Sequence, residues 1–125
     1  MSPEIVARVD AWLAAQPDKN PWLAHDWRSA STLWRYRRAK DPEDASGTVA
    51  SAAASMRGIL LALVRDAWGD SRASATPERG RPGEEWACCV LPPASKVGRM
   101  FVAGSEDDAI VAALEAAPRR EVADG

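Results

Sequence analysis

The side chains best suited to catalysis are few in this chain of 125 residues. It has one histidine, His25, and two adjacent cysteines, Cys88 and Cys89. His25 precedes Asp26 on a predicted helix, and sequence neighbours on a helix do not face each other, so they form no ready-made acid–base pair. On a strand, Cys88 and Cys89 would point to opposite faces and could not address one ligand together. We therefore interpret both cysteines as small buried residues.

Metal and cofactor chemistry also lacks ligands. Zinc, haem and iron–sulfur centres need more histidine and cysteine than the chain contains. The acidic residues 106–108 could attract Mg²⁺ or Ca²⁺, but no ligand loop surrounds them, and carboxylates are favoured in the first turn of any helix. Ser95, Lys96 and Arg99 could hold a phosphate or carboxylate, yet no glycine-rich cradle or nucleotide fingerprint accompanies them. We predict no cofactor and no metal, and we favour a role without catalysis.

The composition predicts one soluble globular domain over residues 1–125. The chain is 46% hydrophobic and 27% charged, and its net charge of −2 excludes a uniformly basic surface. The richness in arginine and alanine is typical of GC-rich coding DNA, so we expect a bacterial or phage source. No apolar signal region is readable near the start, and the longest apolar run, 59–64, is far short of a membrane span. We expect a cytoplasmic protein.

Three helices are predicted in the first half of the chain. Ser2 with Pro3 begins a helix over 3–15, and Asn20 with Pro21 begins a second one that ends at Lys40. Ser46 or Thr48 could cap a third helix, which ends at Trp68 because Gly69 follows. Arg28 and Arg35 point one way on the second helix, whereas its apolar residues fall within an opposite arc of about 140°, which is typical of an amphipathic helix. These apolar residues are Trp22, Leu23, Trp27, Ala30, Leu33 and Trp34.

The third helix carries two different faces. Bulky residues fill one side, whereas small ones recur on the other at spacings of four, three and four. This small-residue row consists of Ser51, Ser55, Gly58 and Ala62. Because small side chains let another backbone approach closely, we expect this helix to be central, with the row covered either by the first two helices or by a second copy of the chain.

The second half predicts a smaller mixed unit. Residues 69–84 show no apolar periodicity and are expected to be a mobile loop. A strand pair over 85–91 and 99–103 follows, and Ser105 begins a last helix that ends before Pro118. Residues 119–125 are expected to be a frayed tail. The predicted fold class is therefore α+β and predominantly helical, with three N-terminal helices, a long loop and a strand–strand–helix unit over 85–118.

Six tryptophans are the most unusual feature of the composition. Trp12, Trp27 and Trp34 fall on apolar arcs and are expected in the core. Trp22, Trp68 and Trp86 lie at element ends, where a half-exposed ring is suited to contact with a partner. The first hypothesis is a non-catalytic adaptor, regulator or inhibitor that acts by helix packing as a homodimer and by occupying a protein partner's surface. Its expected interface consists of Trp22, Trp68, Trp86, Arg28, Arg35, Arg38, Ser51, Ser55, Gly58 and Ala62.

Two alternatives stay open. A nucleic-acid-associated protein could use the basic end of the second helix and the arginines of the loop. Its expected contacts are Arg35, Tyr36, Arg37, Arg38, Lys40, Arg72, Arg79 and Arg81. A small enzyme could instead use Cys88 or Cys89 with Lys96 or Arg99.

Overall fold

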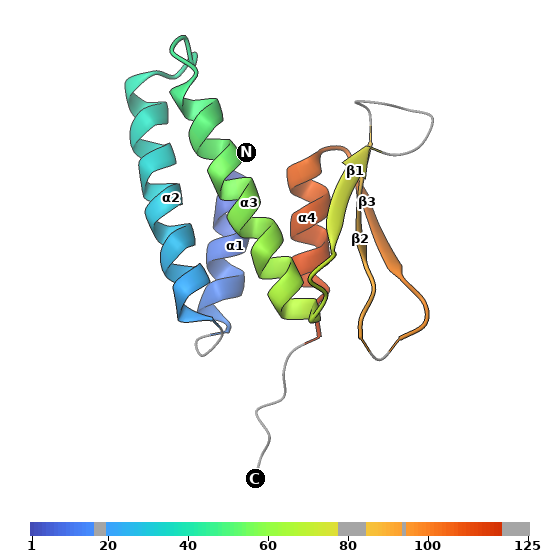
Figure 1. Ribbon diagram of the computed structural model, residues 1–125. Helices are drawn as coiled ribbons and strands as arrows, with labels where there is room; N and C mark the ends of the chain where they lie inside the picture. Colours follow the sequence, from blue (N-terminus) through green and yellow to red (C-terminus); the bar gives the residue numbers. More distant parts are fainter. Residues whose placement is uncertain (17–19, 78–84, 94, 119–125) are drawn as a thin grey trace. The chain divides into compact units, whose positions relative to one another are not determined.

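A computed structural model describes residues 1–16, 20–77, 85–93 and 95–118 (Figure 1). The described elements are α1 (Pro3–Ala14), α2 (Pro21–Lys40), α3 (Thr48–Trp68), β1 (Ser74–Pro77), β2 (Trp86–Val90), β3 (Arg99–Ala103) and α4 (Glu106–Glu115). The fold is α+β and predominantly helical, as the sequence predicts. The chain divides into two compact units, Met1–Leu63 and Val64–Gly125, with the boundary inside α3.

Hydroxyl and amide caps begin the first two helices at the predicted residues. The Ser2 hydroxyl accepts a hydrogen bond from the Ile5 N–H at 3.3 Å, and the Asn20 side chain accepts one from Leu23 at 3.2 Å. In both cases a proline stands at the first helical position, where a missing N–H costs nothing. Local sequence therefore sets where α1 and α2 begin.

The start of α3 differs from the prediction, because neither Ser46 nor Thr48 caps its first turn. The Asp44 carboxylate does so, accepting hydrogen bonds from the N–H groups of Val49 at 2.8 Å and Ala50 at 2.9 Å. Asp44 adopts a left-handed backbone with a φ of 54°, which turns its side chain back onto the helix. Aspartate tolerates this conformation better than most residues do.

The buried face of α2 is rotated from the predicted arc. The residues that α2 buries are Ala24, Trp27, Ser31 and Trp34, at spacings of three, four and three. Leu33 is 44% exposed although it lies on the apolar arc, and Trp22, which was expected to be a half-exposed ring at an element end, is 79% exposed. Ser31 can take a core position because its hydroxyl donates to the Arg28 carbonyl at 3.2 Å and is not left unpaired.

Helix α3 buries its bulky side, including Met56, Leu60 and Leu63. Its small-residue row is uncovered: Ser51, Ser55 and Gly58 are exposed, and Ala62 is half-buried. A Cβ added at Gly58 would have no heavy atom within 4 Å outside its own helix backbone. The expectation that the chain's own helices cover this row is therefore wrong, and coverage by a second copy stays a prediction.

The end of α3 is set by Gly69, as predicted. Gly69 has a φ of +67° and its N–H donates to the Asp66 carbonyl, while the Asp70 N–H reaches back to the Arg65 carbonyl at 3.0 Å. This pair of bonds is the Schellman motif, which needs a left-handed residue just past the helix.

By length and composition alone α3 could cross a membrane, a test that the core helices of soluble proteins also pass.

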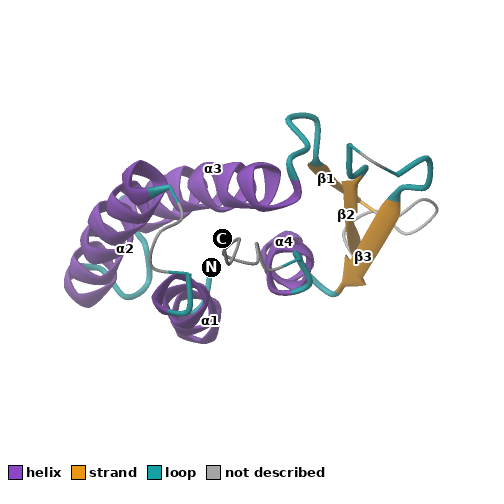
Figure 2. Cartoon of the chain, turned by 90° about the horizontal axis from the view of Figure 1, so that it is seen from below, coloured by secondary structure: helices purple, strands orange, loops and turns teal. Residues whose placement is uncertain are grey.

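The second unit is built around a three-stranded antiparallel sheet in the order β1-β2-β3, and α4 lies against one face (Figure 2). Cys88 pairs with Phe101 on the face toward α4, and Cys89 pairs with Met100 on the opposite face. Residues 74–77 form β1, so the expected loop was wrong there. The segment lacks apolar alternation and is an edge strand that pairs only with β2. The expected mobile residues 78–84 and the tail 119–125 lie outside the described residues.

Candidate functional site

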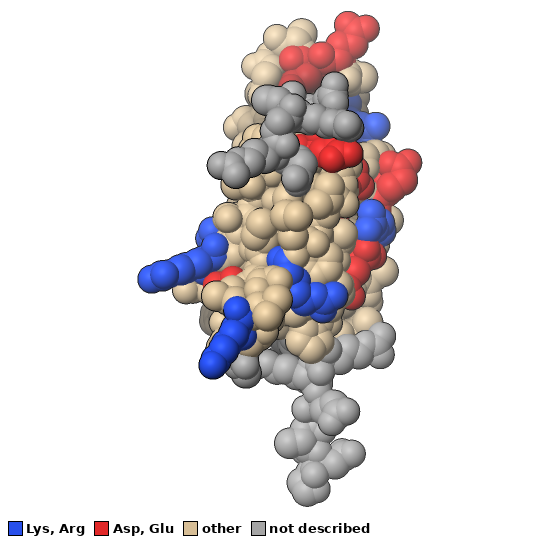
Figure 3. All heavy atoms as spheres, turned by 90° about the vertical axis from the view of Figure 1, so that its right-hand side faces the viewer, with Lys and Arg blue, Asp and Glu red and all other residues tan. Residues whose placement is uncertain are grey.

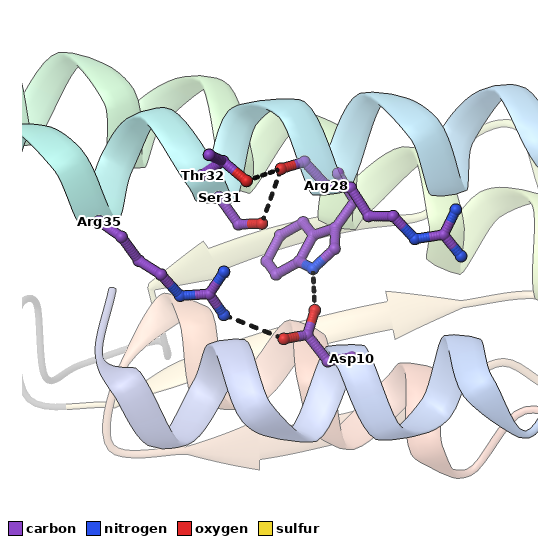
Figure 4. Close-up of polar contacts among 6 residues, drawn as sticks. Asp10, Arg28, Ser31, Thr32 and Arg35 are labelled. Carbon is purple, nitrogen blue, oxygen red and sulfur yellow. Dashed lines mark hydrogen bonds and ion pairs between the residues drawn. The ribbon is translucent and has the colours of Figure 1, made fainter.

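A carboxylate on α1 joins it to α2 (Figure 4). One oxygen of Asp10 accepts a hydrogen bond from the Trp27 indole Nε1–H at 2.9 Å, and the other pairs with Arg35 at 3.1 Å. Trp27 is fully buried, so its indole N–H needs a partner within the protein. Asp10 therefore fixes the rotation of α2, and this rotation decides which face of α2 meets solvent.

Two hollows lie along the seam between α1 and α2, and both include Asp10 and Arg35. One of about 580 Å³ also contains Trp34 and Arg38, and the other, of about 390 Å³, contains Arg28. The predicted interface arginines therefore line the seam rather than the outer side of α2. Arg38 lies over the Trp34 ring, with its guanidinium carbon 5.1 Å from the centroid.

The outer side of α2 carries a line of exposed large hydrophobic residues. Trp22, Leu33 and Tyr36 are 79%, 44% and 61% exposed. Leu33 and Tyr36 follow Trp22 by 11 and 14 residues, which is close to whole numbers of helical turns, so the three side chains lie within about 60° of one another. We call these three residues the outer stripe. It faces away from the buried side of α2, which carries Trp27 and Trp34.

The structure separates the residues that the sequence grouped into one interface. Trp68 is only 6% exposed, so the expectation of a half-exposed ring was wrong. Its indole N–H donates to the Ala113 carbonyl at 2.8 Å, and its ring centroid lies 5.9 Å from that of Phe101. Trp86 is half-buried in β2. Sequence reasoning missed Leu33 as a surface residue, although its heptad-like spacing from Trp22 and Tyr36 was a usable signal.

Most of the expected nucleic-acid contacts on α2 already have partners within the chain. Arg37 donates to the Thr48 carbonyl at 3.2 Å, and the Lys40 ammonium lies 5.7 Å from the Tyr36 ring centroid. Arg72 belongs to the second unit, and Arg79 and Arg81 lie outside the described residues. The described residues therefore form no single basic track on α2, and nucleic-acid binding stays a prediction.

The two cysteines occupy opposite faces of β2, as the alternation predicts. Burial, with a smaller contribution from the neighbouring thiol, raises the pKa of Cys88 to about 11, which disfavours the reactive thiolate. Cys89 is exposed, so the expectation that both cysteines are buried was wrong for this residue, because its position on β2 points away from α4. It lines a hollow that also includes Lys96. The hollow therefore brings Lys96 to the same side as Cys89, whereas the Arg99 guanidinium lies over the Trp68 and Phe101 rings on the face of Cys88.

Histidine and acidic groups provide no further centre in the part of the chain that the structure describes. His25 is exposed on α2. Ser105 and Asp108 form the predicted cap of α4, with the Ser105 hydroxyl 3.1 Å from the Asp108 N–H and 2.7 Å from its carboxylate. No group of three His, Cys, Asp or Glu residues in these segments could hold a metal ion.

The outer stripe is the most prominent apolar feature of the described residues of the first unit. No protein-family model, curated protein or solved structure matches the chain.

Proposed function

We propose that this protein is a non-catalytic protein-interaction protein that forms a homodimer through the outer stripe of α2. The observation that carries the proposal is the alignment of Trp22, Leu33 and Tyr36 on one solvent-facing side of a 20-residue helix. Tryptophan and tyrosine are the residues most enriched among those that dominate binding energy at interfaces.

The area of the outer stripe is large enough to form a substantial part of a protein interface. Taking the exposed fractions with ordinary side-chain areas, its three residues offer roughly 400 Å². A standard interface buries about 800 Å² on each partner, so the stripe supplies about half of one. A homodimer buries the outer stripe of both copies, so at about 25 cal/mol per Å² this burial would contribute on the order of 20 kcal/mol. Association costs roughly 4–15 kcal/mol, and the remainder is enough for the roughly 8 kcal/mol of micromolar binding. We therefore expect a dimer of micromolar affinity.

A second copy of the chain offers a surface of complementary shape. In the small-residue row of α3, Ala62 follows Ser51 by 11 residues, a rise of about 16 Å, and in the outer stripe Tyr36 follows Trp22 by 14 residues, a rise of about 21 Å. Small side chains on one helix leave space for bulky side chains on another. In the proposed dimer, the outer stripe of each copy packs on the small-residue row of its partner, and a two-fold axis makes the two contacts equivalent.

The dimer would act as an adaptor, regulator or inhibitor in the cytoplasm of a bacterium or phage-infected cell. Arg28 and Arg38 lie on the α1–α2 seam rather than on the outer stripe, so they stay accessible in the proposed dimer. Arginine is enriched at protein interfaces, which makes this seam the expected contact for a different protein.

The homodimer is tested by light scattering coupled to size-exclusion chromatography, from low to high micromolar concentration. The wild-type chain is expected to be a dimer at the upper end. Gly58→Leu places a bulky side chain where the monomer has open space, so it is expected to keep the fold and to yield a monomer. Trp22→Ala removes the largest ring of the stripe and is expected to do the same.

Ala50→Leu is the matched control. Ala50 is exposed on α3 but lies outside the small-residue row, so this variant is expected to dimerise like the wild type. Circular dichroism checks that each variant is folded. A wild-type chain that is monomeric throughout the concentration range would overturn the proposal, and so would a folded Gly58→Leu variant that dimerises normally.

A further inference from the structure

A hollow with a basic rim lies at one end of the sheet in the second unit. Its volume is about 500 Å³, and we call it the basic hollow. It is lined by Asp70, Arg72, Ser74, Cys89, Val90, Leu91, Lys96, Gly98, Arg99 and Met100. In Figure 3, Lys and Arg side chains lie around the lower part of an uncharged surface, and Asp and Glu side chains lie along its top and right-hand edge.

Asp70 joins the two walls of the basic hollow. Its carboxylate accepts hydrogen bonds from the Arg72 N–H at 2.9 Å and from the Leu91 N–H at 2.8 Å. The first bond fixes the segment between α3 and β1, and the second fixes the end of β2. The walls are therefore held in place without a ligand, which reduces the ordering cost of binding.

The charge of the basic hollow favours an anion. Two cationic side chains, Arg72 and Lys96, stand against one carboxylate, and both oxygens of that carboxylate accept hydrogen bonds from backbone N–H groups. The guanidinium carbon of Arg99 lies 5.3 Å from the Trp68 ring centroid and 5.2 Å from that of Phe101. Because Arg99 pairs with Val90, two residues along from the Cys88–Phe101 pair, its side chain lies on the face toward α4, opposite to that of Cys89.

The remaining lining gives the basic hollow an apolar part and a chemical reporter. Val90, Leu91 and Met100 supply apolar surface, and the thiol of Cys89 is exposed. Binding sites for small molecules commonly combine a mostly apolar wall with a few convergent polar groups. The size and lining suit a compact organic anion rather than a polymer.

We propose that the basic hollow binds a small organic molecule carrying a phosphate or carboxylate group, with the anion at Arg72 and Lys96 and the apolar part beside Cys89. Both anions fit the planar donor fork of arginine and the ammonium of lysine. This site belongs to the second unit and does not depend on dimerisation through α2.

Alkylation of Cys89 tests the anion preference of the basic hollow. Iodoacetate is anionic and iodoacetamide is neutral, but both transfer a group to the thiol sulfur and release iodide. At Cys89 the rate constant for iodoacetate is divided by that for iodoacetamide, both measured by mass spectrometry. This ratio is then divided by the same ratio for N-acetylcysteine amide, which cancels the intrinsic reactivity of the thiol. We expect this normalised ratio to be about three to ten at low salt, and to fall toward one at high salt.

Variants and competing anions test whether the preference for iodoacetate arises in the basic hollow. Arg72→Gln and Lys96→Gln are each expected to lower the normalised ratio at least twofold, whereas Arg28→Gln, on the other unit, is the charge-matched control and leaves it unchanged. Inorganic pyrophosphate and succinate are each compared with sodium chloride at equal ionic strength. If only pyrophosphate slows the alkylation of Cys89, the ligand carries a phosphate. If only succinate slows it, the ligand carries a carboxylate.

A normalised ratio near one in the wild-type chain would overturn the proposal. A ratio that is unaffected by both Arg72→Gln and Lys96→Gln would overturn it as well, and so would a lack of protection by both competitors. None of these measurements reports on the oligomeric state, so failure here is distinguishable from failure of the proposed homodimer.

Discussion

Replacing Asp10 by alanine removes the one acceptor seen for the Trp27 indole N–H. Trp27 is fully buried, and leaving a buried donor unpaired costs about 1–3 kcal/mol. The lower half of this range applies, because the Asp10 side chain is 43% exposed and water can partly replace it. The ion pair with Arg35 is also solvent-exposed and adds little.

The change in helix propensity acts in the opposite direction. Alanine is favoured over aspartate within a helix by about 0.6 kcal/mol. We therefore expect Asp10→Ala to lower the free energy of unfolding by about 1 kcal/mol net. Asp10→Asn keeps an oxygen acceptor for the indole and is expected to cost about 0.5 kcal/mol or less.

A double-mutant cycle with Trp27→Phe isolates the hydrogen bond. Phenylalanine has no N–H, so in that background Asp10→Ala is expected to be neutral or slightly stabilising, and the coupling free energy is about 1 kcal/mol or more. Urea unfolding followed by far-ultraviolet circular dichroism gives the four free energies without relying on tryptophan emission. A coupling free energy below about 0.5 kcal/mol would refute the inference that Asp10 orients α2 through Trp27.

Three further predictions concern the turns and the sheet. In the native chain a disulfide-based thiol reagent is expected to titrate one thiol, that of Cys89, and two after denaturation, because burial raises the pKa of Cys88 to about 11. Asp44→Ala is expected to lower the free energy of unfolding by about 1–2 kcal/mol in urea titrations, whereas Asp44→Asn costs less because it keeps an acceptor and tolerates the left-handed backbone. Hydrogen bonds from the Leu91 N–H and then the Arg72 N–H lower the pKa of Asp70 from 3.8. The contribution of Asp70 to the free energy of unfolding is therefore full above pH 3.8 and is lost as the pH falls through the lower folded-state pKa. In an acid titration the free energy of unfolding of Asp70→Asn is expected to fall less steeply than that of the wild type, and an equal slope would contradict this account.

The sequence by itself determined the features that depend on nearby residues. Ser2, Asn20 and Ser105 cap their helices as predicted, because each side-chain oxygen accepts a hydrogen bond from an N–H only three residues further along the chain. Gly69 ends α3 for the same local reason. Alternation along β2 correctly placed Cys88 and Cys89 on opposite faces.

Only the tertiary structure decided the features that depend on distant partners. The helical period identified an apolar arc on α2, but the bond between Asp10 and Trp27, 17 residues apart, sets which part of that arc is buried and leaves Trp22 and Leu33 exposed. Strand β1 gains its hydrogen bonds from β2, so its own residues carry little signal. Arg72 and Lys96 both line the basic hollow, whose walls are joined by the hydrogen bond from the Leu91 N–H to the Asp70 carboxylate, 21 residues earlier in the chain. Spacing along a helix or strand is local and readable, whereas rotation, edge pairing and the meeting of charges depend on contacts that form only when the chain is folded.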